Sequence, residues 1–113
     1  MGAIYNLNPA SVPTPPQPLA RNAGTPVSTA ITTTSSVALA ANANRANYSF
    51  YNAGPATILL REGTTVAANS YERPLPPGFH FHSEPSSYRY TGPVSMIATS
   101  GTATVMVTES TLI

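Results

Sequence analysis

The sequence predicts an all-β protein, an antiparallel β-sandwich or barrel of about eight or nine short strands with an extended proline-rich N-terminal arm. Three observations predict this fold class. No segment of useful length repeats apolar residues at the helical period. Short runs rich in Val, Thr, Tyr and Phe recur at intervals of about 8 to 12 residues. Gly, Pro and Asn separate these runs, as is typical of strands joined by turns.

Residues 1–26 are predicted to form the arm, and residues 27–113 the β-sandwich domain. Six of the 12 prolines fall in the arm, where they remove backbone donors and favour extended chain. At ~3.1 Å per residue the arm could span roughly 80 Å, well beyond a body about 25–35 Å across. A disordered tail is the alternative on composition alone. The residues expected to bind a partner are Ile4, Tyr5, Leu7, Pro13, Pro15, Pro16 and Pro18.

The strands after the arm are predicted from the alternation of apolar and polar residues and from the Gly, Pro, Asn and Ser residues that separate the alternating runs. The first one or two are expected at 27–33 and 36–41, before a turn at 42–44. A strand at 47–52 would place Tyr48 and Phe50 on one face and Ser49 and Tyr51 on the other. Further short strands are predicted at 56–61, 64–68, 71–73, 78–83 and 88–91, with breaks at 53–55, 62–63, 69–70, 74–77 and 85–87.

Residues 94–109, VSMIATSGTATVMVTE, carry the clearest local pattern. Two alternating segments flank Ser100-Gly101, a dipeptide suited to a tight turn because Gly accepts positive φ. The pattern therefore predicts a β-hairpin with a two-residue loop. Six side chains would share one face of this hairpin, namely Val94, Met96, Ala98, Ala103, Val105 and Val107.

Large apolar side chains also fall on both faces of the same predicted strands, as with Phe50 and Tyr51 or Met96 and Ile97. A two-layer sandwich needs only one apolar face per sheet. We therefore expect the surplus to be buried between subunits of a homo-oligomer, with a trimer favoured.

Composition disfavours several partners. Charged residues make up only 8% of the chain and the formal net charge is +1, so no basic stripe is available for nucleic acid or an anionic membrane. No apolar stretch approaches the ~20 residues that a membrane helix needs, and the N-terminus lacks the pattern of a secretory signal. With no Cys, the redox compartment is undetermined.

A weak metal-site candidate consists of His80, His82 and Glu84, which would project from one face of an unbroken strand. Two imidazoles and a carboxylate can bind Zn²⁺, and the spacing is similar to the cupin metal motif. The Glu follows too closely, however, and the chain has no other His. The favoured interpretation is a polar strand face with Phe79 and Phe81 in the core, and we expect no metal and no cofactor.

The sequence does not predict an enzyme. It has no Asp, no GxSxG motif and no phosphate-binding loop. The four Glu residues are expected to be loop or rim charges rather than a glycosidase pair. Tyr88 and Tyr90 could form a sugar-stacking platform, although Tyr is equally common in interfaces. Four Arg residues, one per hairpin, are expected to act with the four Glu residues as bidentate clamps between strands or subunits; they are Arg45, Arg61, Arg73 and Arg89.

Three segments, 44–63, 71–78 and 90–109, resemble parts of small β-rich accessory virion proteins of tailed bacteriophages. That group includes capsid decoration, or cement, proteins and head-fibre modules. The resemblance implies a structural protein made in the host cytoplasm and placed on the capsid exterior, with the major capsid protein or another virion protein as partner. It assigns no individual binding residues. The alternatives are a tail, neck or fibre adaptor of the virion, or a carbohydrate-binding β-sandwich module.

Overall fold

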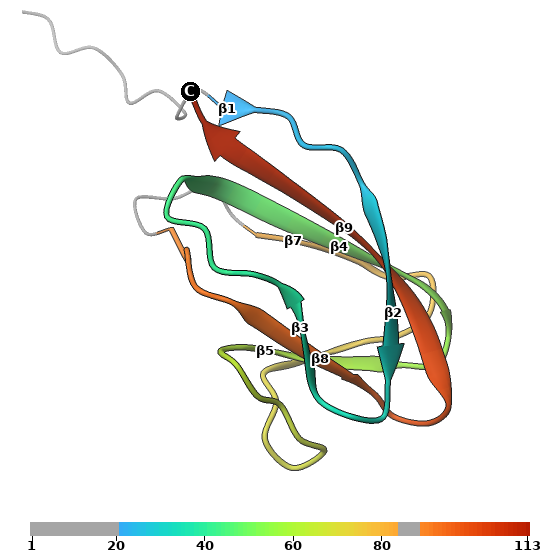
Figure 1. Ribbon diagram of the computed structural model, residues 1–113. Helices are drawn as coiled ribbons and strands as arrows, with labels where there is room; N and C mark the ends of the chain where they lie inside the picture. Colours follow the sequence, from blue (N-terminus) through green and yellow to red (C-terminus); the bar gives the residue numbers. More distant parts are fainter. Residues whose placement is uncertain (1–20, 84–88) are drawn as a thin grey trace, which may run out of the picture.

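The computed structural model describes residues 21–83 and 89–113, and this part of the chain is all-β, with nine strands and no helix (Figure 1). The predicted fold class is confirmed at this level. Of the predicted arm, only residues 21–26 lie within the described part. The strands are β1 (Arg21–Asn22), β2 (Val27–Thr32), β3 (Ser36–Leu39), β4 (Arg45–Pro55), β5 (Ile58–Glu62), β6 (Arg73–Leu75), β7 (His80–His82), β8 (Val94–Ala98) and β9 (Thr102–Leu112).

The strands form two antiparallel sheets that pack together as a sandwich. Sheet A has the order β1-β9-β4-β7, and β2 also pairs with β9, alongside β1. Sheet B has the order β3-β8-β5-β6. The core between the sheets contains Ile31, Leu39, Tyr48, Phe50, Ile58, Leu60, Leu75, Val94, Met96, Ala98, Ala103, Val105 and Val107.

The long pair β4–β9 forms the centre of sheet A. Its register places Phe50 opposite Val107, and both side chains face the core. The predicted two faces of β4 are confirmed, since Tyr48 and Phe50 are buried while Tyr51 is exposed. Two bulges interrupt β4, one between Arg45 and Asn47 and one between Asn52 and Gly54. The predicted break at 53–55 therefore lies inside the strand rather than after it.

The hairpin predicted for residues 94–109 is wrong. β8 belongs to sheet B and pairs with β3 and β5, whereas β9 belongs to sheet A. The turn at Gly101 (φ 57°) carries the chain from one sheet to the other. The six residues predicted to share one face are all buried, but they meet across the sandwich instead of side by side. Alternation shows which side chains face inward and does not show which strands exchange hydrogen bonds.

The loop between β5 and β6 covers part of the outer face of sheet B, while Val37 on the same face stays exposed. The strand predicted at 64–68 is absent there, and an isolated bridge joins Ala67 to Ser70. Val66 packs on Leu59 and Ile97 as a second buried cluster. Ile97, one of the apolar residues from which self-association was predicted, is thus covered by the chain itself. Tyr51 remains 42% exposed.

Two other short segments differ from prediction. β6 includes Pro74 and lies at the edge of sheet B. Proline is tolerated in an edge strand, because the backbone N–H that it lacks can be one that would have no partner strand. Residues 89–91, predicted as part of a strand, are not in one.

β1 and β2 form one edge of sheet A with an extra residue between them. Asn22 lies opposite Thr111 and Val27 opposite Val107, so the four residues 23–26 on this edge lie opposite the three residues 108–110 of β9. Gly24 lies in the irregular stretch, where an added Cβ would be 1.7 Å from the carbonyl oxygen of Glu109. Only glycine allows the backbone to approach β9 this closely.

Candidate functional site

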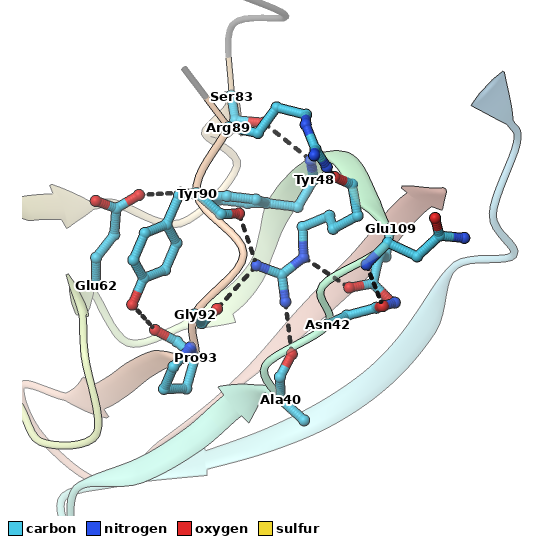
Figure 2. A network of polar contacts seen from close by, with 12 residues as sticks. Ala40, Asn42, Tyr48, Glu62, Ser83, Arg89, Tyr90, Gly92, Pro93 and Glu109 are labelled. Atoms are coloured by element: carbon cyan, nitrogen blue, oxygen red, sulfur yellow. Dashed lines mark hydrogen bonds and ion pairs between the residues drawn. The ribbon is translucent and has the colours of Figure 1, made fainter. Parts of the chain in front are cut away.

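A partly buried polar cluster surrounds Arg45 (Figure 2). We call it the end cluster, and Arg45 is at its centre. The bulge at the start of β4 turns Arg45 inward, and the residue is fully buried. The other members are Ala40, Asn42, Tyr48, Glu62, Ser83, Arg89, Tyr90, Gly92, Pro93 and Glu109.

The guanidinium group of Arg45 joins four separate segments. Its Nε donates to Glu109 Oε2 at 2.7 Å. Its Nη1 donates to the carbonyls of Tyr90 at 3.0 Å and Gly92 at 2.8 Å, and its Nη2 donates to the carbonyl of Ala40. The prediction that Arg45 clamps strands together is confirmed, but the predicted bidentate pairing with a Glu is wrong. Its contact with the carboxylate is through Nε alone, because Nη1 and Nη2 bind carbonyls.

The carboxylate of Glu109 is held from two sides, since Asn42 Nδ2 also donates to its Oε1 at 3.3 Å. Asn42 in turn accepts a hydrogen bond from the backbone N–H of Asn44 at 3.0 Å, which fixes the turn between β3 and β4. The ion pair, the turn and the end of β9 therefore form one unit. Its geometry is that of a structural clamp.

Tyr48 and Glu62 connect the end cluster to sheet B. The Tyr48 hydroxyl donates to Glu62 Oε2 at 2.9 Å. Burial, together with this carboxylate, raises the pKa of Tyr48 well above its usual range. Tyr48 is therefore a permanent hydrogen-bond donor at neutral pH and not a proton acceptor.

Arg89 and Tyr90 complete the cluster beside a surface depression of about 260 Å³ that Tyr48, Glu62 and Phe81 also line. Arg89 Nη1 donates to the carbonyl of Arg45. The Tyr90 hydroxyl donates to the carbonyl of Pro93 at 2.6 Å, and its half-buried ring packs against the core. Tyr90 thus supports the fold, while Tyr88, its predicted companion in a sugar platform, lies outside the described residues.

His80 and His82 lie on the outer side of the edge strand β7, and both are exposed. Their ring centroids are 6.0 Å apart, and Nε2 of His82 is 3.5 Å from Nδ2 of Asn47. Glu84, the third candidate ligand, lies outside the described residues. Across 21–83 and 89–113, no three or more His, Cys, Asp or Glu side chains are grouped as a metal site would require.

The phenylalanines beside these histidines differ from prediction. Phe81 packs against the core and stacks on Phe50, with centroids 6.3 Å apart. Phe79 was predicted to be in the core, but it is 60% exposed. It precedes β7, directly after the turn at Gly78 (φ 83°), so the alternation that buries Phe81 does not extend to it.

The other charged candidates have structural neighbours. Arg73 lies over the ring of Phe81, with its Cζ atom 4.5 Å from the centroid, and Arg61 donates to Ser70 Oγ at 3.3 Å. Glu72 accepts a bond from the backbone N–H of Glu62 at 2.9 Å. Glu72 is thus a loop charge as predicted, whereas the same prediction is wrong for Glu62 and Glu109, which lie within β5 and β9 and bind Tyr48 and Arg45.

Sequence reasoning missed Asn52, which is fully buried in β4. Its Nδ2 donates to the carbonyls of Ala56 and Leu75 at 2.8 and 2.7 Å, and its Oδ1 accepts from the N–H of Gly54 at 2.7 Å. An Asn at an inward position of an alternating strand was the available signal, because a buried amide needs local partners.

A second missed feature is a depression of about 340 Å³ between β2 and β3, with both apolar and polar side chains in its lining, which we call the edge groove. Val27 in this groove is 58% exposed. The seven residues predicted to bind a partner, from Ile4 to Pro18, lie outside the described residues. No helix long and apolar enough to cross a membrane occurs in the part of the chain that the structure describes.

No protein-family model matches the chain, and neither a curated protein nor a solved structure matches it.

Proposed function

We propose that this protein is a non-enzymatic structural protein of a virion, a capsid decoration (cement) protein that binds the outside of a phage head. Its β-sandwich would lie on the capsid, and its arm would extend to neighbouring subunits. The partner is the major capsid protein or another virion protein, and the sandwich assembles as a homo-oligomer, with a trimer favoured.

One observation carries this proposal. The described part of the chain builds its own two-sheet core, whose buried hydrophobic residues run from Ile31 to Val107. The proline-rich sequence joins this body at Arg21, in a short strand at the edge of sheet A. A folded body that is joined at its edge to a proline-rich segment is suited to linking protein subunits, and this supports a structural role over a catalytic one.

The outer face of sheet A gives further support. Its outward side chains on β2, β4, β7 and β9 include no Arg and no Glu, and the charge on this face is that of Arg21 in β1, which donates to Ser110 Oγ at 2.8 Å. The outward side chains of the longer strands include Ser28, Ala30, Thr32, Ser49, Tyr51, Ala53, His80, His82, Thr102, Thr104, Met106 and Thr108. A surface with few charges loses little desolvation energy on contact with another protein.

Many weak contacts are sufficient for a cement protein. Copies arranged on a repeating shell bind with high avidity although each contact is modest. Polyproline sequence also loses little conformational entropy when it is ordered on a partner.

The proposal is tested by removing residues 1–20, which leaves β1 and Gly24 in place. We expect the truncated protein to keep its fold, measured by circular dichroism and thermal melting. We expect it to bind less to particles that lack the protein than the full-length protein does. Alternatively, particles that carry the truncated protein should be less stable to heat than particles that carry the full-length protein. Full retention of both properties by the truncated protein would contradict the proposal.

A further inference from the structure

The edge groove lies where the two sheets separate. β2 and β3 diverge from the connection at 33–35, and the space between them widens toward the start of β2 (Figure 1). The residues that line the groove are Thr25, Val27, Thr29, Ala38, Leu39, Ala40, Val107 and Glu109.

Residues of β2 that face the interior lose their cover along this groove. Ile31 lies opposite Ala103 and is fully buried, whereas Val27 lies opposite the inward-facing Val107 and is 58% exposed. Thr29, between them on the same face, is half-buried. The described residues therefore leave one end of the inner face of sheet A open, and an apolar side chain placed there would be removed from water.

β2 is also available for pairing. In the part of the chain that the structure describes it pairs with β9 alone, so its other side presents N–H and C=O groups without a strand partner. Such an edge accepts an added strand from another segment, with main-chain hydrogen bonds giving affinity and adjacent pockets giving selectivity.

We propose that residues 3–8 (AIYNLN) of a second copy of this chain bind in the edge groove and pair with the free side of β2. This deepens the proposed function, on whose arm it rests, by naming another copy as one of the arm's partners. Residues 3–8 contain no proline and can donate to a strand ladder. Tyr5 and Leu7 would face the groove together, because side chains two apart share a face.

The charges of the groove and the segment are compatible. Residues 3–8 carry no charge. The single charged side chain lining the groove is Glu109, and Arg45 and Asn42 already hold its carboxylate. Docking of this segment would therefore leave no new charge without a partner.

The position of the arm favours a neighbour over the same copy. The described chain begins at Arg21, and Thr25, four residues later, already lines the groove. The sequence between residues 8 and 21 contains five prolines, and an extended segment of this length would span roughly 40 Å at ~3.1 Å per residue. Because proline-rich sequence favours extended chain, such a segment would reach another copy's groove more readily than it would reverse into its own. Head-to-tail exchange of this kind closes into a ring, such as a trimer, or continues as a lattice.

Disulfide trapping tests the proposal. Because the chain has no native Cys, any disulfide must form between the introduced thiols. Full-length protein carrying Leu7→Cys is mixed with full-length protein carrying Thr29→Cys under mild oxidation. The matched control replaces Thr29→Cys with Ala30→Cys, the next residue on the same strand, which faces the opposite side of the sheet. We expect at least about tenfold more cross-linked heterodimer with Thr29→Cys than with Ala30→Cys, because docking raises the effective concentration of the two thiols.

Tyr5→Cys serves as a second probe, so that a register shifted by two residues is also detected, and unchanged melting temperatures show that each variant folds. Cross-linking no greater than the Ala30→Cys control with both probes overturns the proposal. So does a double variant, Leu7→Cys with Thr29→Cys, that forms its disulfide within one chain irrespective of protein concentration. If the copies cross-link but the protein is absent from particles, the inference is supported and the capsid role is refuted. If the protein is present in particles but its copies do not cross-link, only the inference is refuted.

Discussion

The end cluster and the edge groove lie next to each other and share Ala40 and Glu109. Hydrogen bonds join the two sheets in the end cluster, whereas the sheets separate in the edge groove. In the end cluster, one buried guanidinium joins β4, β9 and two connecting segments. In the edge groove, β2 and β3 diverge and Val27 is left exposed. The two sheets are therefore held together at the end cluster, and part of their inner face is open to solvent in the edge groove. We expect stability to depend on the first region and association to depend on the second.

The largest effect is expected from Arg45→Met. The substitution removes the buried cation, leaves Glu109 with the Asn42 amide alone, and removes the donor from three carbonyls. We expect the free energy of unfolding to fall by ~3 kcal/mol, the lower end for a broken buried ion pair, since Glu109 is partly in contact with water. The measurement is urea denaturation at neutral pH.

Arg61→Met is the matched control, because Arg61 is exposed and its guanidinium group donates to the hydroxyl of Ser70, which is also exposed. It should change the free energy of unfolding by less than about 0.5 kcal/mol. Equal effects of the two substitutions would show that the end cluster is not a clamp.

A smaller effect, with a distinctive pH dependence, is expected from Tyr48→Phe. At neutral pH the loss of the hydrogen bond to Glu62 should cost about 1–2 kcal/mol. The raised pKa of Tyr48 in the folded state means that its stabilising effect is complete below the unfolded Tyr pKa of about 10. The effect is lost as the pH rises further, because the unfolded chain then releases a proton that the folded one retains.

Denaturation of the wild type and of Tyr48→Phe between pH 7 and pH 11.5 measures this difference. Tyr51→Phe, on the exposed face of the same strand, is the matched control. A stability difference for Tyr48→Phe that stays constant across the whole range would contradict the assigned hydrogen bond and the raised pKa.

The smallest effect on stability is expected in the edge groove. Val27→Arg should change the free energy of unfolding by less than about 0.5 kcal/mol, since Val27 is largely exposed. Self-association, measured by sedimentation, should nevertheless weaken relative to Ala30→Arg on the opposite face. A large loss of stability, or equal association of the two variants, would remove the distinction between the regions.

Much of the body could be predicted from sequence. The all-β class followed from the spacing of the strands, and the inward residues of β4, β8 and β9 followed from strict alternation. The pairing of β8 and β9 could not be predicted in this way, because Met96 and Val105 face the interior equally in a hairpin and in a connection between sheets. Phe79 shows a second limit, since alternation fails at the first residue beyond a strand.

The end cluster was only partly predictable. Arg45 was expected to act as a clamp, but its partner Glu109 and the carbonyls of Tyr90 and Gly92 lie far away in sequence. The bulge that turns Arg45 inward leaves no signature in a single sequence. The edge groove was missed for a different reason, because Val27 lies in phase with the buried Ile31 and its exposure depends on where β3 runs.

The central claim is tested most directly by locating and counting this protein in intact particles by electron cryomicroscopy and quantitative mass spectrometry. We predict many copies on the capsid exterior, in a fixed ratio to the major capsid protein, with density leading from the start of β1 to a neighbouring subunit. A few copies at one vertex would indicate a tail, neck or fibre adaptor instead, and absence from the particle would contradict the account.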